Sequence, residues 1–296
     1  MAHGLTYEMP PFRPPSEAFS VLIRVTRGCP WNRCAFCPMY KGSRFQKRSV
    51  AEVTHDIEVA ARLYGEARAA FLGDADSVII PVGQLVEILH HLYRCFSHLE
   101  RVTSYARAKT VFKKPLEDLQ RLSEAGLSRL HLGLESGDDE TLSAMMKGIS
   151  AAQAIEAGLK VKEAGISLSE YVLIGLGGKE NYMRHAERTA AALNRIDPDF
   201  IRVRTLVVIP GTPLASMLCE GTFSPCSGLE LLEEEKRLLE LLEGIHSTFT
   251  SDHVSNLLPL HGKLPEDKDC MLRSLDAVIE RVRSGVWEPE RVVSVL

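Results

Sequence analysis

The chain alternates short β-like runs with longer helical runs between residues 20 and 208, and this alternation limits the fold more than any other feature. Such a pattern is typical of a parallel α/β sheet. Two of the helical runs stop at Gly126 and Gly165, where glycine favours a left-handed helix end. We predict six strands, at 20–26, 69–72, 101–106, 129–134, 167–174 and 200–208, separated by helices at 49–64, 84–96, 116–125, 151–164 and 180–195.

Six strand–helix repeats predict an α/β fold, either a partial (β/α)6 TIM-like barrel or an open wound sheet, with a C-terminal helical extension. We expect an N-terminal extension at 1–19, a core at 20–218, and an extension at 219–296 that packs on the core. In this extension the apolar spacing predicts helices at 229–246 and 269–284. In both architectures ligands bind at the carboxyl ends of the strands.

Polar and glycine residues gather where the predicted strands end. The first strand leads into G-C-P-W-N-R-C-A-F-C-P, and the second ends in G-D-A-D at 73–76. Glu135 and Ser136 follow the fourth strand, and G-L-G-G follows the fifth. Without a following G-K-S/T, the glycine turn does not indicate a nucleoside triphosphate site. Agreement among several strand ends predicts one active site along this edge.

Cys29, Cys34 and Cys37 lie within nine residues and offer three thiolate ligands to one metal centre. Iron–sulfur cubanes normally take four cysteines, so a loop with three leaves one iron open for a cofactor or substrate. Structural zinc sites also use C-x2-C pairs, but they need a fourth ligand, and no second pair follows nearby. The ligand count favours a [4Fe-4S] cluster and leaves zinc as the alternative.

The remaining cysteines and the apolar pattern bear on the compartment. Seven cysteines, four of them scattered, argue against a secreted disulfide framework. Residues 1–16 lack the apolar stretch of a signal peptide, and no apolar run has the length of a membrane-spanning helix. We therefore expect a cytoplasmic protein. Cys219 and Cys226 are too few for an auxiliary cluster and are interpreted as structural thiols.

The net charge of −4 and the pI near 6.2 argue against nucleic acid as the main partner, because a nucleic-acid-binding face is normally basic. The segment 251–268 crowds polar groups around an apolar stretch, including His253, Asn256, His261 and Lys268. This density suggests a loop near the substrate, although a single histidine is usually structural. The sequence does not assign the segment a role.

The strand-end motifs together carry a resemblance. Phe36 stands just before the third cysteine, F-L-G-D-A-D follows the second strand, and H-L-G-L-E-S-G-D-D-E-T-L precedes Lys147-Gly148. I-P-G-T-P-L follows the sixth strand. In this order the motifs resemble the radical S-adenosylmethionine (radical SAM) superfamily. The branch they resemble contains methylthiotransferases, the elongator catalytic subunit and oxygen-independent coproporphyrinogen oxidase.

The resemblance implies a [4Fe-4S] cluster on the three cysteines and S-adenosylmethionine (SAM) bound at its open iron. Reductive cleavage of SAM would give a 5′-deoxyadenosyl radical that removes hydrogen from a substrate, so the chain would be an oxygen-sensitive oxidoreductase. A flavodoxin or ferredoxin would supply the electron. The implied SAM-binding residues are Gly73 with Asp74 or Asp76 for the methionine ammonium, Arg107 for the carboxylate, Glu135 and Ser136 for the ribose or methionyl group, and Phe36, Ile174, Val208 and Ile209 for the adenine.

Two features depart from the usual pattern of the superfamily. The cysteine spacing is C-x4-C-x2-C, and Asp74 and Asp76 replace a more usual Gly and Glu. Structural alternatives also stay open. The two aspartates would suit a turn, Glu135 would suit a pair with a surface lysine, and Arg107 would suit a solvated charge. The leading hypothesis is radical chemistry on a small molecule. The alternatives are modification of RNA or a peptide, a non-catalytic iron–sulfur protein, and a zinc-stabilised binding module.

Overall fold

The computed structural model describes residue 5 and residues 12–289 of the chain. Most of the N-terminal extension predicted at 1–19 lies outside these residues, as does most of the segment examined for a signal peptide. The chain divides into two compact units, which we describe separately. The first unit comprises Met1–Asn32, Met39–Leu132 and Leu159–Leu168, and the second comprises Arg33–Pro38, Gly133–Gly158 and Ser169–Leu296.

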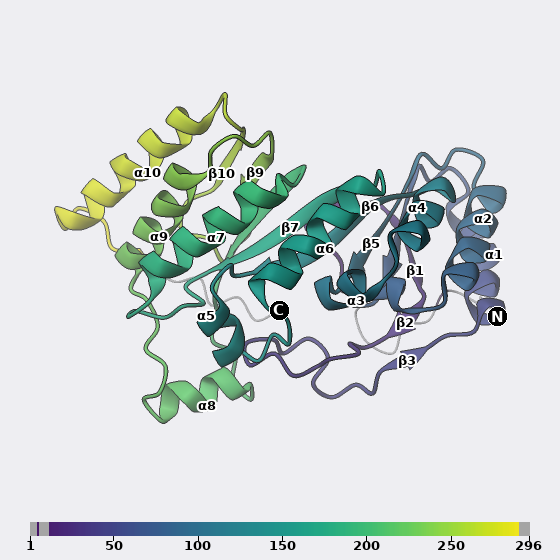
Figure 1. Cartoon of the computed structure of the whole chain (residues 1–296), viewed down its shortest axis with the longest axis horizontal. Helices are drawn as coiled ribbons and strands as arrows, with labels where there is room; N and C mark the ends of the chain where they lie inside the picture. Colours follow the sequence, from purple (N-terminus) through teal and green to yellow (C-terminus); the bar gives the residue numbers. More distant parts are fainter. Residues whose placement is uncertain (1–4, 6–11, 290–296) are drawn as a thin grey trace. The chain divides into compact units, whose positions relative to one another are not determined.

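The first unit contains parallel strands in the order β1, β4, β5 and β6 (Figure 1). Most residues of these strands are buried and apolar, as expected for parallel strands covered by helices, and the buried polar exceptions are Arg24, Thr103, Ser104 and His131. A short antiparallel pair, β2 with β3, follows the end of β1. The strands are β1 Val21–Arg24, β2 Thr26–Arg27, β3 Gln46–Lys47, β4 Ala69–Gly73, β5 Arg101–Ala106 and β6 Leu127–Glu135.

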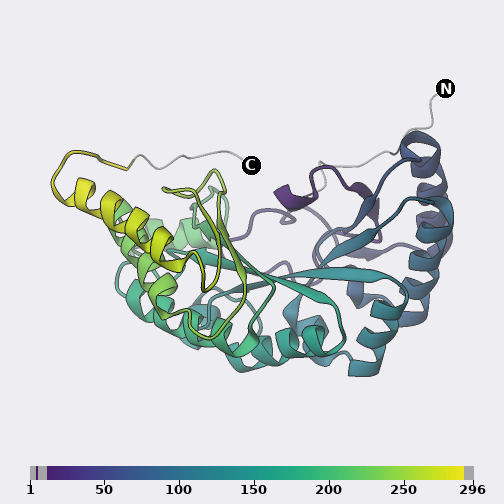
Figure 2. The same ribbon diagram turned by 90° about the horizontal axis from the view of Figure 1, so that it is seen from above.

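Helices pack along one side of the strands of the first unit (Figure 2). The first helix begins with a capping box, in which Ser49 and Glu52 satisfy each other's backbone amides, and it buries Val53, Ile57 and Ala60. Its apolar face packs on β1 and on the second helix. The helices of this unit are α1 Val50–Tyr64, α2 Val82–Cys95, α3 Ala108–Lys113 and α4 Leu116–Glu124, with 3-10 turns η1 Pro15–Glu17 and η2 Ser77–Ile79.

The second unit contains β7, β8 and β9 in parallel, and β10 antiparallel to β9. Helices α7, α9 and α10 pack side by side in that order (Figure 1). The elements are α5 Asp139–Ala144, α6 Ala151–Glu163, β7 Ser167–Ile174, α7 Tyr182–Ile196, β8 Phe200–Thr205, α8 Pro213–Cys219, α9 Gly228–Leu241, β9 Thr248–Ser251, β10 Leu260–Lys263 and α10 Lys268–Arg283. Strands β6 and β7 and helix α6 each begin in one unit and end in the other.

The predicted α/β class and the six strand–helix repeats are confirmed. The C-terminal extension predicted as helical also contains β9 and β10, which the sequence analysis did not predict. The helix expected at 229–246 ends at Leu241, and the chain then turns through Gly244 at a left-handed φ of 69° before it enters β9. The predicted domain boundary at 218/219 stays a prediction. None of the described helices combines the length and apolar character needed to cross a bilayer.

Candidate active site

Asp74 follows β4, and protein donors surround its carboxylate. Arg24 Nε donates to Oδ1 at 2.9 Å, and Arg24 Nη2 donates to Oδ2 at 2.8 Å. The backbone N–H of Gly28 donates to Oδ2 at 2.9 Å. Both side chains are buried, with 5% of Arg24 and 1% of Asp74 exposed. Because Arg24 ends β1 and Gly28 precedes Cys29, Asp74 holds the start of the cysteine loop against the end of β4.

Asp76 lies two residues further along and has fewer partners. Its Oδ2 accepts a hydrogen bond from Thr110 Oγ1 at 2.5 Å, whereas the buried Oδ1 has no hydrogen-bond partner among the described residues. Burial raises the pKa of Asp76 to about 7, against the opposing effects of Thr110 and of the Arg107 charge. An unsatisfied buried acceptor of this kind suits a cationic donor.

Arg107 and Gly73 occupy neighbouring positions in the first unit. Arg107 is the N-cap of α3, and its guanidinium lies 5.3 Å from the centroid of the Trp31 ring, within cation–π range. The Gly73 carbonyl accepts hydrogen bonds from the Val25 amide at 2.6 Å and from Ser77 Oγ at 3.1 Å. The first unit thus holds Gly73, Asp74, Asp76 and Arg107 at or just beyond the carboxyl ends of β4 and β5.

The cysteine loop is divided between the units: Cys29 belongs to the first, whereas Cys34 and Cys37 belong to the second. All three thiols lie outside any disulfide and are partly exposed. The Asn32 amide donates to Cys29 Sγ at 3.4 Å, and the Cys37 amide donates to the Cys34 carbonyl across a tight turn. Within the part of the chain that the structure describes, no three His, Cys, Asp or Glu side chains form a metal-binding group.

Glu135 ends β6 in the second unit with a left-handed φ of 61°, which is rare for a residue with a side chain. Its Oε1 accepts a hydrogen bond from Lys147 Nζ at 2.9 Å, and both side chains are mostly buried. The glutamate folds back over Gly133, where an added Cβ would lie 2.2 Å from Glu135 Oε1. A strained backbone that points one carboxylate in a fixed direction is a common feature of functional sites.

Glu170 on β7 is a second buried carboxylate in this unit. Its Oε2 accepts a hydrogen bond from the Leu134 amide at 3.1 Å. Burial, with a smaller effect from the nearby Glu135 charge, raises the pKa of Glu170 to about 8. At neutral pH we therefore expect Glu170 to be mostly protonated. A buried carboxyl group whose pKa is raised this far is typical of sites that move or hold protons.

Two other predicted residues of the second unit, Phe36 and Val208, pack against an apolar cluster. Phe36 and Val208 are partly buried against Ala35, Met145, Leu176, Leu206, Leu214 and Phe223, and Lys147 Nζ lies 5.9 Å from the centroid of the Phe36 ring.

The backbone carbonyls of Ile174 and Ile209 already accept protein hydrogen bonds, from the Leu206 amide at 2.8 Å and from Thr212 Oγ1 at 2.7 Å. Ser136 is buried, and its Oγ accepts a hydrogen bond from the Asp138 amide. We therefore expect contacts of Ile174 and Ile209 with an adenine to use their side chains or amides.

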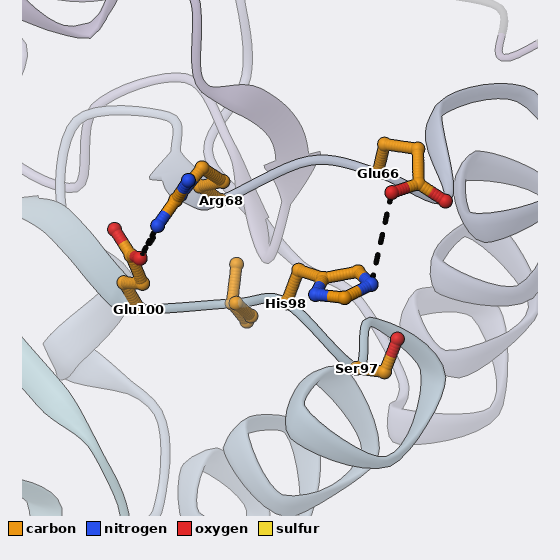
Figure 3. A pocket seen from close by; sticks show the side chains of 6 residues that line it. Glu66, Arg68, Ser97, His98 and Glu100 are labelled. Carbon is orange, nitrogen blue, oxygen red and sulfur yellow. Dashed lines mark hydrogen bonds and ion pairs between the residues drawn. The ribbon is translucent and has the colours of Figure 1, made fainter.

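A pocket of about 370 Å³ lies at the opposite, amino-terminal ends of β4 and β5 (Figure 3). It is lined by Leu99 and by exposed polar residues. Arg68 pairs with Glu100, and His98 Nε2 lies 3.7 Å from Glu66 Oε2. None of the predicted site residues lines this pocket. Its ion pairs face solvent, so it lacks the buried, partly satisfied polar groups found at the other ends of the strands.

Residues 23–193, more than half of the chain, match the radical SAM superfamily. This match spans the cysteine loop, the Asp74–Asp76 turn, Arg107, Glu135 and Ile174. The chain belongs to the radical SAM superfamily. It is a radical SAM enzyme, and the comparisons leave its reaction unspecified.

The known proteins that resemble this radical SAM enzyme carry the names of different enzymes. A tRNA-2-methylthio-N(6)-dimethylallyladenosine synthase from Neisseria meningitidis is 28% identical over 71% of this chain and 48% of its own. The methylornithine synthase structure covers 92% of this chain and 83% of its own at a TM-score of 0.53 and 18% identity.

A radical SAM methyltransferase from Kitasatospora setae, solved with cobalamin and a [4Fe-4S] cluster bound, covers 68% of this chain and 39% of its own at a TM-score of 0.55 and 20% identity. The chain spans about half the length of the curated relatives it matches. At these identities the structural likeness shows the fold alone.

The donor types of this radical SAM enzyme suit the superfamily's cofactors, although its three loop thiols are not gathered into one group in this structure. Three partly exposed thiols outside any disulfide suit a cubane in chemistry and number, and the amide hydrogen bond to Cys29 Sγ is of the kind that tunes cluster-ligating sulfurs. The unsatisfied Oδ1 of Asp76 suits an ammonium group. Asp74, in contrast, already has three protein donors.

Sequence reasoning did not single out Arg24, Thr110 or Glu170. A carboxylate in the apolar strand S-L-S-E-Y-V-L-I was a signal for Glu170, because parallel strands are normally apolar on both faces. Arg24 carried no comparable signal, since its partner lies 50 residues away and only the pairing of β1 with β4 brings them together.

Proposed function

We propose that this radical SAM enzyme cleaves SAM reductively and removes a hydrogen atom from a small-molecule substrate. The observation that carries the proposal is the superfamily match across residues 23–193, which includes the three-cysteine loop and the strand ends that follow it. The polar, partly satisfied groups at those strand ends support it. We also retain the cytoplasmic location as a prediction, supported by seven cysteines that form no disulfide.

Cys29, Cys34 and Cys37 would ligate the [4Fe-4S] cluster. When bound, the cluster and SAM supply one-electron cleavage of the sulfonium C–S bond, which yields methionine and a deoxyadenosyl radical able to take a hydrogen atom from a C–H bond. Flavodoxin or ferredoxin is the kind of reductant we expect to deliver the electron. The Asp74 contacts with Arg24 and Gly28 would keep the loop in position while the cofactors bind.

In the first unit we assign the methionine ammonium to Asp76 and the Gly73 backbone. Asp76 is preferred to Asp74 because its Oδ1 has no hydrogen-bond donor among the described residues, whereas both oxygens of Asp74 accept hydrogen bonds from Arg24 or Gly28. Binding a cation there would convert a carboxyl group with a raised pKa into a paired carboxylate. Arg107, with its fork of donors, suits the carboxylate of the methionyl group.

In the second unit we assign Glu135 and Ser136 to the ribose or methionyl group. The left-handed backbone at Glu135 and the Lys147 ion pair hold the glutamate in one orientation, which supports a binding role. Phe36, Ile174, Val208 and Ile209 are assigned to the adenine. Phe36 and Val208 are packed against the apolar cluster, so that a flat apolar ligand would find a preformed surface.

RNA is the alternative substrate class, because a curated relative modifies tRNA according to its name. The net charge of −4 favours a small molecule, since RNA binding draws most of its affinity from basic side chains that contact phosphate. Binding of tRNA that weakens steeply with added salt would favour the alternative. Affinity too weak to measure at physiological salt would support the small-molecule proposal.

The test of the function is an anaerobic assay for 5′-deoxyadenosine after iron and sulfide reconstitution, with SAM and dithionite. We expect the product from the wild type and none from a variant with Cys29, Cys34 and Cys37 changed to Ala. The matched control changes Cys95, Cys219 and Cys270 to Ala, which removes three thiols outside the loop and should leave the product and the iron content unchanged. Equal product from both variants would contradict the proposal.

A further inference from the structure

Strand β8 in the second unit carries two arginines that the proposed function leaves without a role. Arg202 and Arg204 are two positions apart, and because side chains alternate along a strand they share one face. Their α-carbons are therefore separated by about 6–7 Å. Both are half-buried, whereas the alternating Ile201 and Val203 are buried on the opposite face. Two guanidinium groups thus lie side by side on the polar face of one strand.

Neither arginine has a carboxylate within ion-pair distance among the residues that the structure describes. Arg202 Nε donates to Ser169 Oγ at 3.1 Å, and its guanidinium lies 5.5 Å from the Phe200 ring centroid. The guanidinium of Arg204 lies 5.0 Å from the Tyr171 ring centroid. Partly burying two cations without an anion costs free energy, and each guanidinium has five N–H donors to satisfy. The pair is therefore prepared for an anion that the described residues do not provide.

The loop at 252–259 is fixed at the carboxyl end of the same strand. Asn256 Nδ2 donates to the Val203 carbonyl at 2.9 Å and to Ser251 Oγ at 2.8 Å. The Thr205 amide donates to Ser255 Oγ at 3.2 Å. These bonds join side chains of the loop to backbone groups near the end of β8 and to Ser251 of β9, and so fix the position of the loop.

His253 belongs to this loop, and its pKa is influenced by the charge of Arg204. Its Nδ1 lies 2.8 Å from Ser255 Oγ, which fixes the ring. Burial, together with the charge of Arg204, lowers the pKa of His253. The imidazole is thus expected to be neutral at physiological pH and able to hydrogen-bond a ligand without adding charge. The polar segment that the sequence left unassigned thus includes a histidine close to Arg204.

We propose that Arg202 and Arg204 bind an oxyanionic group of the substrate, a carboxylate or a phosphate, with the His253 loop beside it. The inference rests on the proposed function and adds the chemical class of the substrate. Planar guanidinium groups match oxyanions by paired N–H···O bonds, and the carboxyl end of a parallel strand is where substrates bind in α/β proteins. Half-burial of both side chains favours a compact anion over an extended RNA backbone.

The test measures the thermal unfolding midpoint of the anaerobically purified full chain with millimolar inorganic phosphate, propionate or sodium chloride at equal ionic strength. We expect phosphate, propionate or both to raise the wild-type midpoint by about 2–4 °C at about ten times the dissociation constant. The shift should vanish in Arg202→Gln/Arg204→Gln. The matched control, Arg188→Gln/Arg195→Gln, removes two exposed arginines of α7 and should keep the shift.

The same variants are tested for SAM binding by equilibrium dialysis, and we expect the SAM dissociation constant to stay within twofold of the wild type. A rise of tenfold or more in the Gln variant would overturn the inference, because the arginines would then bind the SAM carboxylate. No midpoint shift in the wild type, a shift retained in the Gln variant, or displacement of phosphate by stoichiometric tRNA would also overturn it.

Should the Gln variant fail to fold, Arg202→Lys/Arg204→Lys decides, since lysine keeps the charge but not the paired hydrogen bonds. A phosphate affinity reduced about tenfold supports the inference, and an unchanged affinity contradicts it. The anion measurement requires no SAM cleavage. Absence of deoxyadenosine would therefore count against the proposed function and leave the anion site standing, while loss of the anion site would leave radical SAM cleavage untouched.

Discussion

The charged residues at the two ends of the parallel strands in the first unit differ in their exposure to solvent. At the carboxyl ends, Arg24 and Asp74 form an ion pair with 5% and 1% of their side chains exposed. At the amino ends, Arg68 and Glu100 form a pair with 73% and 59% exposed (Figure 3). Both pairs join segments that neighbour β4. The difference lies in the solvent, which weakens the exposed pair and makes the buried one costly to disrupt.

Two buried carboxylates sharpen the comparison. Glu17, before β1, accepts hydrogen bonds from Ser20 and Arg101, and Glu17 Oε1 lies 3.5 Å from His131 Nε2. Burial alone would raise the pKa of Glu17, but the neighbouring His131, the Ser20 hydrogen bond and the Arg101 charge lower it to about 2. Asp76, at the other end, has a pKa raised to about 7. The comparison shows that the polar and charged neighbours of a carboxylate, and not burial alone, decide the direction in which its pKa shifts.

The largest effect is expected from Asp74→Ala, which leaves Arg24 buried without its partner and the Gly28 amide without an acceptor. Breaking a buried ion pair from one side costs about 3–5 kcal/mol of unfolding free energy. Urea denaturation monitored by circular dichroism measures this loss. A loss below about 1 kcal/mol, as for an exposed pair, would remove the distinction between the two ends of the strands.

The next effect concerns acid stability and Glu17. Because folding lowers the pKa of Glu17 from 4.5 to about 2, its ionised form stabilises the fold above pH 4.5, and this contribution is lost as the pH falls toward 2. Glu17→Gln should therefore lose up to about 3 kcal/mol at pH 7 and show a flatter stability profile between pH 4.5 and 2. Unfolding curves recorded across this range test it, and parallel profiles for the two proteins would contradict it.

Asp76→Asn should have the opposite pH signature. Folding raises the pKa of Asp76 from 3.8 to about 7, so wild-type stability falls as the pH rises from about 4 to 7. The Asn variant should lack this fall and be at least as stable as the wild type at pH 8. Its SAM affinity should decrease about tenfold, a change worth about 1.4 kcal/mol. A destabilised variant that binds SAM normally would mark Asp76 as a structural residue.

The smallest effect is expected from Glu100→Ala, the exposed counterpart of the Asp74 change. Solvent and salt screen the Arg68–Glu100 pair, so the urea midpoint should be indistinguishable from that of the wild type. The SAM affinity should also be unchanged, since Glu100 lies at the amino ends of the strands. A midpoint shift comparable to that of Asp74→Ala would show that exposure does not decide the strength of these pairs.

The fold was predictable where local patterns are long and strong. The strands at 101–106 and 167–174 have the predicted bounds, and a serine-led capping box marks the start of α1. The short helices α3, α5 and α8 were not predicted. They have six or seven residues, which is less than two full turns and too short for a periodic apolar pattern. Strands β9 and β10 have four residues each and depend on pairing with β8 and with each other, which no local pattern indicates.

The candidate site was predictable in its parts and not in its pairings. The strand-end motif G-D-A-D indicated both Asp74 and Asp76, because nothing in the sequence distinguishes the roles of the two aspartates. Only the folded structure separates them, through Arg24 on β1 and Thr110 on α3, which lie 50 and 34 residues from their partners. The alternation I-R-V-R-T in β8 was visible in the sequence, but its meaning depends on which charges face it.

The interleaving of the two units has a consequence for the order in which a nascent chain gains structure. The first unit includes Leu159–Leu168, which follows a stretch of the second unit, so it is complete only after residue 168 has been synthesised. Strands β6 and β7 are shared between the units, and no linker separates the two. Domains of a growing chain usually fold from the N-terminus onward. Here the N-terminal segments of the first unit cannot complete their fold until residues 159–168 have been synthesised. Resistance to protease on the ribosome should therefore develop late, and for both units nearly together.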